Sequence, residues 1–138
     1  MTDQDHNKNL ENVKDLLTNT KDKTENFEKD DIEKNKTIAA LAYLIFFLPL
    51  ICCPNSKFAR FHANQGLDLL FFSIASNIVL GVITNILLSI TWRLAFLWSL
   101  FYGVLSLVML LLLILGIMNA LNGKAKELPV IGKFTIIK

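Results

Sequence analysis

Three long apolar runs constrain the fold of this chain more than any other feature. They cover residues 37–53, 66–90 and 94–121, which makes them 17, 25 and 28 residues long. A helix that crosses the hydrocarbon layer of a membrane needs roughly 17 to 25 such residues. The runs lack the polar face that a helix on a soluble core shows. We therefore expect an all-α fold, an integral membrane helical bundle.

Charged residues are concentrated in the first quarter of the chain. Residues 1–36 contain seven lysines and ten acidic residues, whereas residues 37–121 contain only four lysine, arginine or acidic side chains. A segment so rich in charge and poor in apolar residues buries too little surface to offset chain entropy. We predict a largely disordered tail over 1–36, in which residues 10–18 form an amphipathic or transient helix, and a membrane domain over 37–138.

The preferred topology has three transmembrane helices, near 37–53, 66–90 and 94–121, followed by an interfacial segment over 122–138. Only three residues separate the second and third runs, so these two helices should pack antiparallel. One of the three is Trp92, whose indole suits the headgroup layer.

The first run leaves an alternative open, two spans plus a re-entrant segment. It has the minimum length and contains Pro49, which removes an amide donor. Three spans are preferred because irregular backbone at membrane depth must be covered by protein. With three spans, six Lys and Arg residues flank each membrane face and the sidedness is undetermined; with a re-entrant segment, eleven of the twelve lie on one face.

Polar and small residues form a narrow stripe on the second run: Ser73, Asn77, Gly81 and Thr84. Such residues let helices approach closely and hydrogen-bond to each other. The stripe is interpreted as a helix-packing seam, and the alternative is a polar track for a substrate or lipid headgroup.

Functional groups are densest between the first and second runs, around Arg60, His62 and Asp68. A metal site needs three or four donors, and the only other histidine is His6 in the tail. Cys52 and Cys53 are adjacent, which fits neither a disulfide framework nor a metal knuckle. We predict no catalytic residue, no metal site, no cofactor and no enzyme activity.

The end of the third run carries a helix stop. Gly123 suits a helix C-terminus, Lys124 complements the helix dipole, and Pro129 prevents continuation. In both topologies this segment falls on the same side as the Arg60 to Asp68 cluster, so the two can meet.

Three motifs resemble a known family: A-A-L-A-Y-L-x-F-F-L-P near the start of the membrane half, F-x-R-F-H-A-N-Q-G-L, and N-G-K-x-K-E-L-P-V-I-G after the last run. They are similar to a bacterial membrane family of unknown function that resembles the chloroplast Tic-twenty-like protein-import component and includes the magnetosome proteins MamF and MmsF. The resemblance implies a small multi-pass helical protein. The plastid relatives have four spans, whereas this chain has three runs. The motif positions form a candidate interaction face: Phe61, His62, Gln65, Gly123, Lys124, Pro129 and Gly132.

These observations favour a non-enzymatic scaffold or assembly factor that acts through its interfacial loops. The alternative is a subunit of an oligomeric protein-translocation or transport complex, lined by the polar stripe. The expected partners are the lipid bilayer and other membrane proteins or further copies of the chain, with no nucleic acid, because no basic patch with interleaved aromatics appears. The expected location is the cell inner membrane.

Overall fold

The computed structural model describes residues 20–92, 94–129, 131–132 and 136–137. These residues form one short 3-10 turn and four α-helices: η1 (Thr24–Asn26), α2 (Lys29–Leu41), α3 (Leu48–Cys52), α4 (Lys57–Ile90) and α5 (Leu94–Leu121). Within the described ranges the only β-type contact is an isolated bridge between Asp22 and Lys126. The all-α fold class is confirmed.

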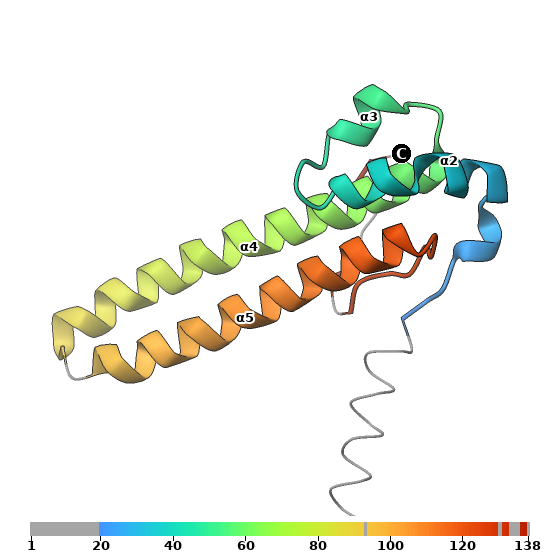
Figure 1. Cartoon of the computed structure of the whole chain (residues 1–138). Helices are drawn as coiled ribbons and strands as arrows, with labels where there is room; N and C mark the ends of the chain where they lie inside the picture. Colours follow the sequence, from blue (N-terminus) through green and yellow to red (C-terminus); the bar gives the residue numbers. More distant parts are fainter. Residues whose placement is uncertain (1–19, 93, 130, 133–135, 138) are drawn as a thin grey trace, which may run out of the picture.

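Helices α4 and α5 form a long antiparallel hairpin (Figure 1). Trp98 of α5 donates to the Thr84 hydroxyl of α4, and Tyr102 donates to Asn77 one turn further along. The antiparallel packing predicted for the second and third runs is confirmed. Helix α5 has the bounds of the predicted run, whereas α4 begins nine residues before it.

Both helices of the hairpin are long and apolar enough to cross a membrane. Only 11% of the most apolar window of α4 and 6% of that of α5 is buried within the fold, so neither is the core helix of a soluble protein. At 1.5 Å per residue the 34 residues of α4 extend about 51 Å, well beyond a hydrocarbon layer of about 30 Å. One end of α4 must therefore lie outside that layer.

Burial changes abruptly along α4, between Leu69 with 6% of its surface exposed and Leu70 with 43%. The residues before this step, together with α2, α3, residues 109–121 of α5 and the described part of the C-terminal segment, form one packed unit, which we call the cap. Residues 70–90 and 94–108 form the remaining hairpin, which we call the arms. Figure 1 shows the cap elements gathered at one end of the hairpin.

The first apolar run is not one helix. Helix α2 ends at Leu41, a turn follows, and α3 begins only at Leu48, so residues 37–53 fold over the end of the hairpin. Pro49 lies in the first turn of α3, where its missing N–H costs no hydrogen bond. The span predicted over residues 37–53 is thus not confirmed, and two helices of spanning length remain.

Part of the predicted tail is folded. The Lys23 amide donates to the Ala125 carbonyl at 2.9 Å, and the Glu127 amide donates to the Lys21 carbonyl at 3.3 Å. Helix α2 then starts at Lys29 and runs through the boundary predicted at residue 36. The disorder predicted for residues 20–36 is not confirmed, and the helix predicted over 10–18 lies outside the described residues.

Candidate functional site

The start of α4 is fixed by two oxygen acceptors. The Ser56 hydroxyl caps the helix by accepting from the Ala59 amide at 3.0 Å. The Asp31 carboxylate of α2 accepts from the Phe58 amide, also at 3.0 Å. Because the first amides of a helix have no partner within it, an acidic side chain there both satisfies a donor and complements the helix dipole. Helix α2 is thereby tied to the beginning of α4.

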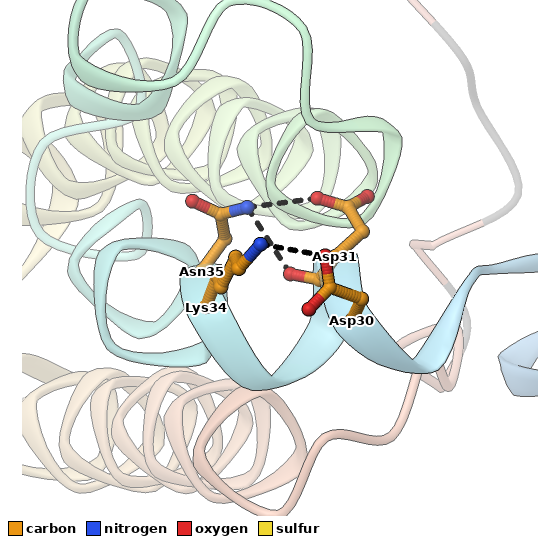
Figure 2. A network of polar contacts seen from close by, with 4 residues as sticks. All are labelled: Asp30, Asp31, Lys34 and Asn35. Carbon is orange, nitrogen blue, oxygen red and sulfur yellow. Dashed lines mark hydrogen bonds and ion pairs between the residues drawn. The ribbon is translucent and has the colours of Figure 1, made fainter.

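Figure 2 shows how Asp31 is held within α2. The Asn35 side chain donates to the Asp31 carboxylate at 2.8 Å, while neighbouring Asp30 pairs with Lys34 at 2.7 Å on the exposed side of the helix. Partial burial raises the pKa of Asp31, but hydrogen bonds from Ser56, the Phe58 amide and Asn35 outweigh it and hold the pKa below its usual value. The Asp31 carboxylate therefore stays a hydrogen-bond acceptor for the start of α4.

Gln65 joins α4 to the C-terminal segment. Its side-chain amide donates to the Gly132 carbonyl at 2.8 Å and accepts from the Leu128 amide at 2.8 Å. Only 2% of the Gln65 surface is exposed. A Cβ at residue 132 would lie 2.3 Å from the Gln65 side-chain oxygen, so only glycine fits there. One glutamine thus satisfies both ends of the Leu128 to Gly132 turn.

Asn64, the preceding residue, holds the last described part of the chain. Its side-chain oxygen accepts from the amides of Ile136 and Ile137, at 2.9 and 2.6 Å, and its side-chain nitrogen donates to the Ile137 carbonyl at 2.9 Å. The predicted meeting of the α4 start with the C-terminal segment is confirmed by these bonds and those of Gln65.

His62 lies in an aromatic enclosure inside the cap. Its Nδ1 is 3.0 Å from the Tyr43 hydroxyl in a hydrogen bond, and the rings of Phe58 and Phe61 contact it edge-on. Its Nε2 is buried and has no hydrogen-bond partner among the residues that the structure describes. The side chain is fully buried, so His62 has no route to a substrate in solution.

Two glycines hold the turn between α2 and α3 against the hairpin. A Cβ at Gly66 would lie 2.3 Å from the Ala42 carbonyl oxygen, and one at Gly116 would lie 2.2 Å from the Tyr43 ring. Their absence of side chains lets the turn approach both helices closely. This contact explains why the first run breaks at this point.

Helix α5 ends at Leu121, and Gly123 two residues later has a φ of +67°, which fits the helix stop predicted there. The following segment carries charged contacts to the start of the described chain. Lys23 pairs with Glu127 at 2.5 Å, and its ammonium lies 5.9 Å from the centre of the Phe61 ring. Lys124, three positions before Glu127 in the sequence, is exposed, and Phe61 and Pro129 are partly exposed.

The seven residues of the candidate interaction face divide into two groups. The structure brings them into one cap, but His62, Gln65 and Gly132 are buried and bind other parts of the same chain. The other four are at least partly exposed: Phe61, Gly123, Lys124 and Pro129. Sequence reasoning missed Tyr43, Gly116 and the capping role of Asp31, because each depends on an element distant in the chain.

The polar stripe lies on the side of α4 that meets α5. Asn77 and Thr84 bind Tyr102 and Trp98 of that helix, which fits the predicted packing seam. Gly81 is different, since a Cβ there would meet nothing within 4 Å. Gly81 therefore makes no close helix contact.

The described residues contain no group of three or more metal-binding side chains. Asp68 is buried at 5% exposure, and its Oδ2 has no hydrogen-bond partner in the described part of the chain. On the same side of the helix, the Asn64 side chain donates to the Arg60 carbonyl at 3.3 Å.

Comparison with known proteins gives one match. No curated protein and no solved structure matches the chain. The model of the magnetosome magnetite crystal formation protein family matches residues 34–135, a region that spans all three motifs and nearly the whole of the cap and arms. This chain is a membrane protein that belongs to the magnetosome magnetite crystal formation protein family.

Proposed function

We propose that this protein is a non-enzymatic membrane scaffold or assembly factor that supports magnetite crystal formation from one side of the membrane. The proposal rests on the hydrogen bonds that the polar motif residues make in the structure. His62, Asn64 and Gln65 are committed to hydrogen bonds within the cap, so these three motif residues shape the fold and its surface rather than serve as acid, base or nucleophile.

The proposed topology has two spans, with residues 37–53 re-entering on the cap side. Eleven of the twelve flanking Lys and Arg residues then share the cap face, which places the cap in the cytoplasm by the positive-inside rule. The opposite face holds only the tip at residues 91–93, which has no acidic side chain. So short a tip offers nothing to template a mineral, which favours a role in assembly.

The proposed partner surface is the accessible part of the candidate interaction face. Lys124 is exposed, and Phe61 lies beside the Lys23 and Glu127 ion pair. An aromatic residue with charges around it resembles the centre and rim of a protein interface. The partner would be another membrane protein or a further copy of this chain.

The alternative, a subunit of a translocation or transport complex, has less support. Its proposed lining included Asn77 and Thr84, and both are paired with α5 of the same chain. The resemblance to the Tic-twenty-like protein-import component, which suggested a translocation role, rests on the sequence motifs alone.

Cysteine labelling of intact vesicles tests the topology. In a background without Cys52 and Cys53, single cysteines at the exposed positions Asn55 and Asn122, and at Thr91, are labelled from each side. The proposal expects positions 55 and 122 to react from the cytoplasmic face and 91 from the other. A cysteine at Thr18 decides between the topologies, because labelling from the face opposite 55 and 122 would establish three spans.

Complementation tests the function. In a magnetosome-forming strain without its own copy, Lys124→Glu with Phe61→Ala should reduce crystal size at unchanged protein level, because the partner surface is lost. Trp92→Ser at the tip is the matched control and should restore wild-type crystals in electron micrographs. The reverse pattern, normal crystals with the cap variant and defective ones with the tip variant, would refute a cap-side role.

A further inference from the structure

The broken first run exposes apolar side chains although it belongs to the cap. We call residues 41–52, which comprise the turn after α2 and helix α3, the wedge. Its exposed large apolar residues are Leu41 at 41%, Leu44 at 65%, Ile45 at 43%, Phe47 at 50% and Ile51 at 70%. An apolar surface of this kind marks a contact with lipid or with another protein.

The depth of the wedge follows from the length of the arms. Trp92 at the tip suits the headgroup layer, and a hydrocarbon layer of about 30 Å corresponds to about 20 helical residues. Counted back from Ile90 along α4, the layer ends near Leu70, where burial changes. The turn of the wedge lies at this level, because it lines a cavity of about 350 Å³ together with Leu70 and Ser73. The apolar surface of the wedge therefore continues the lipid-exposed surface of the arms.

Polar residues on both sides keep the wedge shallow. On α2, the exposed Lys34 lies seven residues before Leu41, which is about 10 Å along the helix. After α3, Asn55 and Lys57 are exposed. Because charged groups stay in water or among the headgroups, the wedge can enter only the outermost part of the hydrocarbon layer.

The two leaflets meet different cross-sections of the protein. In the tip-side leaflet the described chain contributes α4 and α5, each about 10 to 12 Å wide. On the cap side, the turn and α3 lie beside these two helices (Figure 1). The close contacts of Ala42 with Gly66 and of Tyr43 with Gly116 hold the turn against the hairpin. A shallow insertion held in this way spreads the headgroups of one leaflet more than its chain ends, which favours convex curvature of that leaflet.

We propose that the wedge is seated in the cap-side leaflet and that it directs this protein to membrane whose cap-side leaflet is convex. The proposal rests on the two-span topology proposed above, in which the first run re-enters on the cap side. Lipid is the contact of the wedge because its apolar surface is continuous with that of the arms.

Quenching of a dye by lipids tests the insertion. In a background without Cys52 and Cys53, Ile51→Cys of the full chain carries a polarity-sensitive dye in vesicles of phosphatidylethanolamine and phosphatidylglycerol. Lipids with a spin label near the headgroup end of the acyl chain should quench this dye more than lipids labelled at the chain end. Asn55→Cys, just after α3, is the matched control and should be quenched by neither.

Two results of this measurement would overturn the proposal. Quenching at position 51 by neither lipid would place α3 in water. Stronger quenching by the label at the chain end would place α3 too deep to spread the headgroups.

A membrane tube pulled from a giant vesicle tests the curvature preference. In the same background, Asn122→Cys is labelled from outside, so only molecules with the cap on the outer, convex leaflet are seen. The chain with an intact wedge should be enriched about threefold in the tube over the flat membrane. Phe47→Ser with Ile51→Ser should remove this enrichment. Met118→Ser with Leu121→Ser is the control and should keep it, since it also replaces two exposed apolar residues of the cap.

The control pair lies away from the edge of the hydrocarbon layer. Met109 lines the same cavity as the turn, and Met118 is nine residues, about 13 Å, further from the tip. Equal enrichment of the intact chain and the Phe47 and Ile51 variant, or equal loss in both double variants, would overturn the proposal. Failure of the two-span topology is recognised separately, by labelling of a cysteine at Thr18 from the face opposite position 55.

Discussion

Amide side chains have different hydrogen-bond partners in the cap and in the arms. In the cap, amide side chains such as Gln65 are buried and bind backbone groups more than 60 positions away in sequence. In the arms, Asn85 is exposed and its side-chain amide donates to the carbonyl of Gly81 in its own helix. The cap is held by polar bonds between distant segments, whereas the arms present an apolar surface and their polar groups bind within one helix or across the hairpin.

This contrast shows where the specificity of the fold lies. Two apolar helices define only a hairpin, because lipid provides no hydrophobic force that selects a particular partner face. The hydrogen bonds of Asn64 and Gln65 determine which segment covers the end of the hairpin and in what register it packs. Substitutions of equal chemistry should therefore have unequal effects in the two regions.

The largest difference is expected for Gln65→Leu against Asn85→Leu. The first leaves the Leu128 amide and the Gly132 carbonyl buried without partners, at about 1 to 3 kcal/mol each. The second should change stability by no more than about 0.5 kcal/mol. Unfolding of the purified protein by sodium dodecyl sulfate, followed by tryptophan fluorescence, measures both. Equal losses would abolish the distinction between cap and arms.

The sequence predicts the arms better than the cap for a physical reason. The bounds of α5 follow from composition alone, since the residues from Leu94 to Leu121 are almost all apolar. The break after Leu41 depends on Gly66 and Gly116, which lie 25 and 75 positions further along. No local pattern records such a contact, so the first run was predicted as one helix.

Next in size is Gly66→Ala, compared with Gly81→Ala on the same helix. The added methyl group at residue 66 meets the Ala42 carbonyl at 2.3 Å, and overpacking of this kind costs about 1 to 3 kcal/mol. At residue 81 nothing lies within 4 Å, so alanine should stabilise the helix by up to about 1 kcal/mol. The same detergent titration decides, and destabilisation by both would show that α4 packs closely along its whole length.

A smaller effect is expected for Asn77→Leu in the seam of the arms. Its bond with Tyr102 crosses between the two helices, and such bonds in membranes contribute about 0.6 kcal/mol on average and about 1.7 at most. A double-mutant cycle with Tyr102→Phe measures the coupling. If crystal formation fails in Asn77→Leu while stability falls by less than this, the polar stripe has a function beyond packing and the transport alternative gains support.

The candidate site shows the same limit of sequence reasoning as the fold. The motif positions were found, and their meeting in one cap was predicted, but their exposure was not. His62 and Gln65 look like surface groups in the sequence because polar residues usually are. Both side chains can be buried because Tyr43 and the Leu128 to Gly132 turn supply hydrogen-bond partners, which offset the cost of removing polar groups from water.

The smallest expected effect separates two acidic residues at the edge of the cap. Because the folded-state pKa of Asp31 lies below its ordinary value of 3.8, its contribution to stability is present above that pH and is lost as the pH falls through the lower folded value. A charge at a helix N-terminus contributes about 0.3 to 1 kcal/mol. Between pH 5 and pH 2.5, Asp31→Asn should lose less stability than wild type, since its amide oxygen stays a neutral acceptor for the Phe58 amide throughout. Asp30→Asn is the control, because that exposed side chain pairs with Lys34 and does not touch α4. Parallel pH profiles for Asp31→Asn and wild type would mean that the charge of Asp31 does not hold α2 to α4, and that shape alone joins them.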